Sequence, residues 1–182
     1  KKKLPITTFL YALGYSRQEI LDMFYHFRTF EFLREKNLWQ TKFDPSDYKR
    51  PIKLRTDLVN SKNGKKILKK DSKINFIIAK ELFDKGLKSI SFTSDYFIGK
   101  YTKNSLLNPL NNEVLLKSAS LIDQEKLDEI LECKIHTLKI ADVDPVTKGP
   151  YLIDTLNIDK NNSKEEAIND IYKVLRPGEP PS

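Results

Sequence analysis

The chain has little of several residue types, and each shortage excludes a class of protein. Only one of its 182 residues is cysteine, Cys133, so no disulfide can form within the chain, which is typical of a reducing compartment. No apolar run approaches the roughly 20 residues that cross a bilayer, and no stretch resembles a cleavable signal peptide. We therefore expect a cytoplasmic protein with no membrane segment.

Motifs for catalysis and metal binding are also missing. The sequence has neither a P-loop nor a GxGxxG dinucleotide motif. The two histidines, His26 and His136, do not have metal-ligand spacing with Cys133. Three aspartates are close in sequence but too sparse for a dedicated Mg²⁺ site: Asp142, Asp144 and Asp154. We expect no catalytic residue, no bound metal and no cofactor in this chain.

Positive charge is what the chain has in excess. The net charge is +7 and the isoelectric point is near 9.3. Three lysines open the sequence, and a second group decorates the middle: Lys62, Lys65, Lys66, Lys69, Lys70 and Lys73. Two interpretations stay open for this second basic patch. It is either a solvated hairpin in a lysine-rich protein, or a hairpin that faces phosphate groups.

Both ends of the sequence predict short helices. Pro5 suits a first helical turn, Gly14 a left-handed end, and Ser16 with Glu19 a capping box for the next helix. Near the other end, Ser163 and Glu166 have the same spacing. The apolar stripes of these helices are predicted to be core: Ile6, Phe9, Leu10 and Leu13; Ile20, Leu21 and Phe24; Ala167, Ile168, Ile171, Tyr172 and Leu175.

The middle of the chain predicts a hairpin followed by an internal repeat. Residues 29–33 and 38–43 alternate like strands, with Trp39 and Phe43 expected in the core. Segments 58–92 and 106–140 then align without a gap at an offset of 48 residues. Each is predicted to form a strand, a turn, a strand, a helix and a strand. The turns are expected at Asn63–Gly64 and, more weakly, at Asn111–Asn112, and the helices are expected to begin near residues 72–75 and at Asp123. The two helices place Leu82 and Ile130 at equivalent core positions.

These patterns predict an α+β fold with a discontinuous organisation. Residues 28–147 are expected to form an inserted domain of two pseudo-repeated β-hairpin–helix–strand units after a first hairpin, with a possible pseudo-two-fold axis. Residues 1–27 and 148–182 are expected to form part of a second, mostly helical domain. We expect the middle segment to fold alone, and the two ends to depend either on the middle segment or on further chain.

Three stretches resemble one known family. The final IYKVLRPGEPPS is similar to the RPGEPP signature of the bacterial RNA polymerase β subunit, which suggests a segment of a longer chain. KKKLPITTFLYALGYSRQEIL resembles that family's basic run followed by KLP and ALGYS, and GPYLIDTLNIDKNNSKEEAINDIY its GPYI…TL…D…TN segment. The middle resembles the variable external domain inserted in the lobe of proteobacterial β subunits. Lysines replace the usual arginines at the start, so phosphate contacts are more plausible there than base-reading ones.

The resemblance implies a non-catalytic segment of DNA-directed RNA polymerase, a nucleotidyltransferase whose Mg²⁺ is bound elsewhere, by β′. In this family the lobe forms one wall of the downstream DNA cleft. The implied partners are DNA and the β′, α, ω and sigma subunits, in the bacterial nucleoid. The residues expected nearest the DNA backbone are Lys1, Lys2, Lys3 and Arg176. The alternatives are a stand-alone cytosolic protein-interaction module and a non-specific DNA-binding module built on the repeat.

Overall fold

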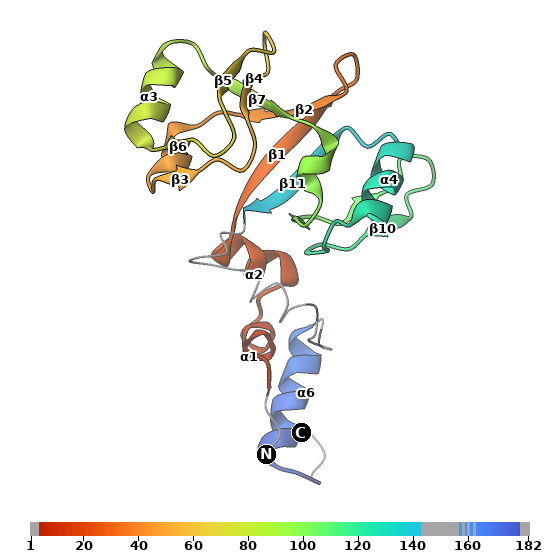
Figure 1. Ribbon diagram of the computed structural model, residues 1–182. Helices are drawn as coiled ribbons and strands as arrows, with labels where there is room; N and C mark the ends of the chain where they lie inside the picture. The colour runs from red at the N-terminus through yellow and green to blue at the C-terminus, as the bar shows by residue number, and fades with distance from the viewer. Residues whose placement is uncertain (1–3, 143–156, 158, 160, 162, 179–182) are drawn as a thin grey trace. The chain divides into compact units, whose positions relative to one another are not determined.

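The computed structural model describes residues 4–142, 157, 159, 161 and 163–178 of the chain. Helices and antiparallel strands alternate along it (Figure 1), so the predicted α+β class is confirmed. Within the described residues, no helix is long and apolar enough to cross a membrane. The chain forms two compact units. Unit 1 consists of residues 1–27, 99–122 and 139–182, and unit 2 of residues 28–98 and 123–138.

Unit 2 is built on an antiparallel sheet that begins with the predicted hairpin. Its strands are β1 (His26–Leu33), β2 (Leu38–Lys42), β4 (Leu58–Asn60), β5 (Lys66–Leu68) and β7 (Ser89–Phe92). Trp39 of β2 pairs with Phe32 of β1 on one side and with Phe92 of β7 on the other. The strand order is β5-β4-β7-β2-β1, so β5 lies at an edge of the sheet.

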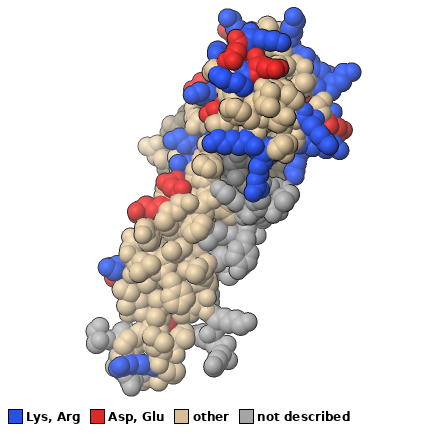
Figure 2. All heavy atoms as spheres, turned by 90° about the vertical axis from the view of Figure 1, so that its left-hand side faces the viewer, with Lys and Arg blue, Asp and Glu red and all other residues tan. Residues whose placement is uncertain are grey.

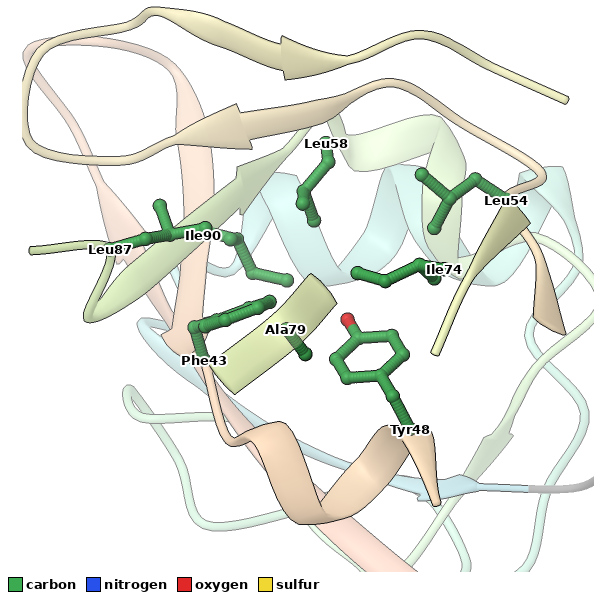
Figure 3. Packing of buried hydrophobic residues seen from close by; sticks show 8 residues of the cluster. All are labelled: Phe43, Tyr48, Leu54, Leu58, Ile74, Ala79, Leu87 and Ile90. Carbon is green, nitrogen blue, oxygen red and sulfur yellow. The ribbon is translucent and has the colours of Figure 1, made fainter. Parts of the chain in front are cut away.

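A core of apolar side chains fills the space between this sheet and helix α3. Besides the sheet, this part of unit 2 contains η1 (Pro45–Tyr48), β3 (Ile52–Lys53), β6 (Lys73–Ile74) and α3 (Phe76–Asp84). Asn75 caps α3 by accepting a hydrogen bond from the backbone N–H of Ile78. Figure 3 shows buried side chains from these elements turned toward one another: Phe43, Tyr48, Leu54, Leu58, Ile74, Ala79, Leu87 and Ile90.

Aromatic rings form a second buried group in unit 2. Phe97, in η2 (Ser94–Phe97), meets Phe30 and Trp39 edge to face, with centroid distances of 5.0 and 5.2 Å. The indole N–H of Trp39 donates to the Ser94 hydroxyl at 3.0 Å, so this buried donor is satisfied. The prediction that Trp39 and Phe43 are core residues is confirmed.

Unit 2 also contains helix α4 (Gln124–Glu132), which Asp123 caps by accepting from the N–H of Lys126. Leu127 and Ile130 are its buried side chains. Strand β11 (Thr137–Asp142) follows it and continues into unit 1.

Unit 1 combines helices from both chain ends with short strands from the middle. Its elements are α1 (Ile6–Ala12), α2 (Arg17–Phe24), β8 (Tyr101–Thr102), β9 (Leu106–Leu107), β10 (Val114–Leu116) and α6 (Lys164–Leu175). Helices α1 and α6 lie side by side (Figure 1). The capping box of Ser16 and Glu19 is present, and Ser163 accepts from the N–H of Glu166. Gly14 has a φ of 98°, as the predicted left-handed helix end requires.

The prediction that the apolar stripe of α1 is core is wrong for three of its four residues, since only Leu10 is half-buried and packs against the buried cluster of unit 1. Ile6, Phe9 and Leu13 are 54%, 44% and 73% exposed. The buried face of this helix consists instead of Thr7, Thr8 and Tyr11. On α6, Ala167 is buried as predicted, whereas Ile168 and Leu175 are 45% and 74% exposed. On α2, Ile20 and Leu21 are buried and Phe24 is exposed.

The inward turn of the α1 threonines has a physical cause. The hydroxyls of Thr7 and Thr8 both donate to the carboxylate of Asp159. The side-chain amide of the buried Asn161 donates to Asp159 at 3.0 Å and to Asp170 at 2.9 Å. Because buried polar groups need partners, this network satisfies the threonines in the interior and leaves the apolar residues of α1 outside.

The elements of the two repeat segments recur 48 residues apart. We name residues 58–92 copy 1 and residues 106–140 copy 2. Strand β5 corresponds to β10, and α3 to α4, with identical spacing of both ends. A positive φ recurs at Gly86 and Lys134, where the helix of each copy has just ended. These coincidences favour the repeat, and the pseudo-two-fold arrangement of its copies stays a prediction.

The compact units divide the chain differently from the predicted domains. Both divisions place a boundary between Phe27 and Arg28. Residues 99–122 and the described residues 139–142, however, belong to unit 1 together with the helices from the chain ends. Backbone hydrogen bonds of unit 1 join Thr102 to Ser120 and Lys103 to Lys139. That 28–147 is one inserted domain, beside a lobe portion of 1–27 and 148–182, stays a prediction.

Candidate nucleic-acid interface

The six lysines of the basic patch lie on consecutive elements of unit 2. Lys62 and Lys65 flank the turn between β4 and β5, Lys66 lies on β5, Lys69 and Lys70 follow it, and Lys73 lies on β6. All six side chains are exposed. Figure 2 shows Lys and Arg side chains gathered over the part of unit 2 that holds α3 and the neighbouring short strands.

Two asparagines fix the turn that carries the first of these lysines. The side-chain oxygen of Asn60 accepts from the N–H of Lys62 at 3.0 Å, and that of Asn63 accepts from the N–H of Lys65 at 2.9 Å. Gly64 has a φ of 72°, which glycine adopts without strain. The Asn63–Gly64 turn predicted from the sequence therefore presents Lys62 and Lys65 on a well-defined loop.

Asp57 is the acidic residue that faces this patch most directly. Its carboxylate accepts from the backbone N–H of Lys70 at 2.7 Å and pairs with the Lys66 ammonium at 3.0 Å. These contacts hold the pKa of Asp57 below its usual range, the Lys70 hydrogen bond being the larger cause. Lys66 is therefore partly neutralised. Among the described residues, none of the other five lysines of the patch has an ion-pair partner within 4.0 Å.

We expect an Asp57→Asn variant to lose thermal stability in a pH-dependent way. A lowered pKa stabilises the fold above the unfolded-state pKa of about 4, and this contribution disappears as pH falls through the folded-state pKa. The melting temperature of the variant should therefore be lower than that of the wild type at pH 7, with a difference that shrinks below about pH 4. Asp95→Asn, at an exposed position, is the control and should change little. A difference that is independent of pH would contradict this assignment.

Most of the basic patch has no counterpart in the sequence of copy 2. Copy 1 contains nine lysines and three acidic residues, whereas copy 2 contains four lysines and six acidic residues. Leu110 occupies the position of Lys62, and Glu113 that of Lys65. Strand β10 and helix α4 form at the corresponding positions of copy 2 without these charges, so the local structure of β5 and α3 does not account for the lysines of copy 1.

The other predicted contacts come from the chain ends. Lys1, Lys2 and Lys3 lie outside the described residues. Arg176 belongs to unit 1, follows the last turn of α6 and is exposed. Its guanidinium carbon lies 5.9 Å from the centroid of the Tyr172 ring, one turn earlier.

The residue types that bind metal ions do not cluster within the described residues. No group of three or more His, Cys, Asp or Glu side chains among them could hold a metal ion. His136 is exposed, as predicted, and Cys133 is half-buried. Asp144 and Asp154, and the side chain of Asp142, lie outside the described part.

Sequence reasoning did not single out Arg17, which links three segments of unit 1. Its guanidinium donates to the Ser118 hydroxyl at 3.0 Å, to the Ser118 carbonyl at 2.8 Å and to the Asn157 side chain. Asn157 in turn donates to the Ala119 carbonyl at 3.0 Å. These partners are 101 and 140 residues from Arg17, so no local pattern could have revealed them.

Along nearly its whole length the chain is similar to bacterial transcription proteins. It is 38% identical over 180 residues to proteins named DNA-directed RNA polymerase subunit beta from Rickettsia massiliae (strain Mtu5) and Rickettsia felis (strain ATCC VR-1525 / URRWXCal2). This chain is homologous to a segment of the RNA polymerase β subunit. A protein of the same name from Caulobacter vibrioides (strain NA1000 / CB15N) is 35% identical over 182 residues.

The match covers 99–100% of this chain but 13% of each relative, so the chain spans about an eighth of the β subunits that it resembles. No family model matches the chain. The resemblance first seen in the motifs at both ends is thereby confirmed, including its proteobacterial type.

Proposed function

We propose that this chain is a non-catalytic part of the β subunit and forms part of the lobe wall of the downstream DNA cleft. The observation that carries the proposal is the match of its full length to one segment of proteins named for the β subunit. RNA synthesis then belongs to the assembled polymerase, in the cytoplasm. The segment contributes shape and positive charge, and the catalytic Mg²⁺ is bound elsewhere.

The exposed apolar side chains of α1 support this role. Ile6, Phe9 and Leu13 recur at helical spacing on one face, and all three are more than 40% exposed. Figure 2 shows that the helical part of unit 1 carries few charged side chains on the face in view. An uncharged, exposed helix face of this kind marks an interaction surface. We assign it to the remaining β polypeptide, which makes up most of the length of the relatives.

A double substitution on this face tests the proposal. In the isolated 182-residue chain, Phe9→Gln with Leu13→Gln should shift the melting temperature by less than about 3 °C, because both side chains are largely exposed. In the complete β subunit the same change should lower the yield of assembled polymerase by at least about tenfold, because losing the burial of two apolar side chains at an interface costs more than the ~1.4 kcal/mol that a factor of ten requires.

The matched control is Lys164→Gln with Lys173→Gln, a change of two exposed side chains on α6. It should leave both the melting temperature and assembly unchanged. Normal assembly of the Phe9 and Leu13 variant would show that this face does not contact the rest of β.

The proposed partners are the other polymerase subunits and DNA. Lys1, Lys2, Lys3 and Arg176 are proposed to lie nearest to the DNA backbone, where counterion release favours cationic side chains. The six lysines of the basic patch are proposed to form the secondary basic surface. The assembled complex, with β′, α, ω and sigma, supplies the active centre.

A further inference from the structure

A groove in unit 2 lies between the β4–β5 turn and the C-terminal end of α3. Ile67, Leu82 and Leu87 give it an apolar lining, and Lys62 and Lys85 add two exposed positive charges. No acidic or aromatic side chain lines it. The combination of apolar surface with positive charge on both flanking segments is the chemistry of a site for a ligand that is both apolar and acidic.

Copy 2 shows that the sequence of this groove is not imposed by the fold. Leu110 and Cys133 occupy the positions of Lys62 and Lys85. Leu82 is half-buried, whereas its equivalent Ile130 is fully buried. The helix of copy 1 thus leaves partly exposed an apolar side chain whose equivalent in the helix of copy 2 is buried.

Gly86 is one of the residues that line the groove. Its φ is 114°, and a Cβ added there would meet no heavy atom within 4 Å. Copy 2 has Lys134 at this position, with a φ of 54°. The φ of copy 1 differs from that of Lys134 and favours glycine, which adds no side chain to the lining of the groove.

We propose that this groove binds an acidic segment of a partner protein. An apolar side chain of that segment packs against Ile67 and Leu82, and its carboxylates pair with Lys62 and Lys85. The side-chain N–H₂ groups of Asn60 and Asn63 have no partner among the described residues, because only their oxygens are bonded. They are donors for carbonyl or carboxylate oxygens of the bound segment.

The lining favours a peptide over a nucleic acid. Single-stranded nucleic acids gain much of their affinity from bases stacked on aromatic rings, and this groove has none. A phosphate backbone would use the two lysines but would leave the apolar surface uncovered. A peptide with leucine and glutamate side chains uses both.

The test uses the 182-residue chain and a fluorescein-labelled peptide of eight residues, two leucines separated and flanked by glutamates. Fluorescence anisotropy at fixed ionic strength should detect binding to the wild type. Lys62→Gln with Lys85→Gln should weaken it about tenfold, because two ion pairs are lost. Lys69→Gln with Lys70→Gln removes the same charge from the same copy outside the groove and should weaken it less than threefold. A probe with serine in place of both leucines should also bind about tenfold more weakly.

Three results would overturn the proposal. The first is no binding of the leucine probe at 1 mM, and the second is an equal loss of affinity in the two lysine variants. The third is tighter binding of a single-stranded DNA oligonucleotide of equal charge, with the same dependence on Lys62 and Lys85. Unchanged circular dichroism melts of both variants ensure that affinity and not folding is compared.

Discussion

Replacing Ile130 by alanine is expected to lower the free energy of unfolding of unit 2 by about 2–5 kcal/mol. Ile130 lies on α4 with none of its surface exposed, so the substitution leaves a cavity in a close-packed interior. Leu82, its equivalent on α3, is only half-buried. Leu82→Ala should therefore cost about 1–2 kcal/mol, since less apolar surface is lost from the interior.

Urea unfolding followed by tryptophan fluorescence measures this difference well. Trp39 is the only tryptophan, is fully buried and belongs to unit 2, the same unit as both substitutions. Equal losses at the two positions would mean that Leu82 is covered in solution. A loss below about 0.5 kcal/mol at Ile130 would contradict its place in the core.

Neutralising Lys1, Lys2, Lys3 and Arg176 within the assembled polymerase is expected to destabilise the open complex and flatten its salt dependence. Each phosphate contact contributes about 0.7–0.9 to the slope of log K against log salt, so four contacts account for a change of about 3. The measurement is the dissociation rate of the open complex at several salt concentrations. Glutamine is the replacement at all four positions.

The comparison variant neutralises five lysines on and beside the hairpin of copy 1: Lys62, Lys65, Lys66, Lys69 and Lys70. This neutralisation should change the slope by less than 1, although it removes five charges instead of four. A larger effect from the hairpin set would make the inserted part the DNA-facing surface and would reverse the assignment.

Much of the fold could be predicted because its signals are local. The capping residues Ser16, Asn75 and Asp123 start helices within one or two residues of the predicted positions. The Asn63–Gly64 turn joins the strands that it was expected to join. Adding the 48-residue offset to the first and last residues of α3 gives the first and last residues of α4. Each of these features depends on side chains and backbone groups a few residues apart.

The direction in which an apolar stripe faces could not be predicted. The stripe of Ile6, Phe9 and Leu13 is compatible with a core or an interface, because periodicity shows that a helix is amphipathic and not what covers it. The deciding contacts join Thr7 and Thr8 to Asp159, more than 150 residues away. Long-range polar contacts of this kind have no sequence period.

The candidate site was predicted in part. The lysines of the basic patch were found because they are clustered in sequence, and their exposure agrees with that prediction. The contribution of Lys85 to the groove was not predicted, because Lys85 and Lys62 line the same groove only when α3 packs beside the β4–β5 turn. The interaction of Asp57 with the basic patch was not predicted either, since its partners Lys66 and Lys70 come from the following strand and loop.

The distance in sequence between Thr7 and Asp159 has a consequence for the order of folding during translation. A ribosome that adds about 5–20 residues per second needs roughly 8–30 s to make the residues between them. By the time Asp159 emerges, every residue of unit 2 has already been synthesised. We expect unit 2 to fold first on the ribosome, because the hydrogen bonds of α1 to Asp159 cannot form until Asp159 has been synthesised. Slow codons between residues 139 and 159 would lengthen that interval and the exposure of α1 to chaperones.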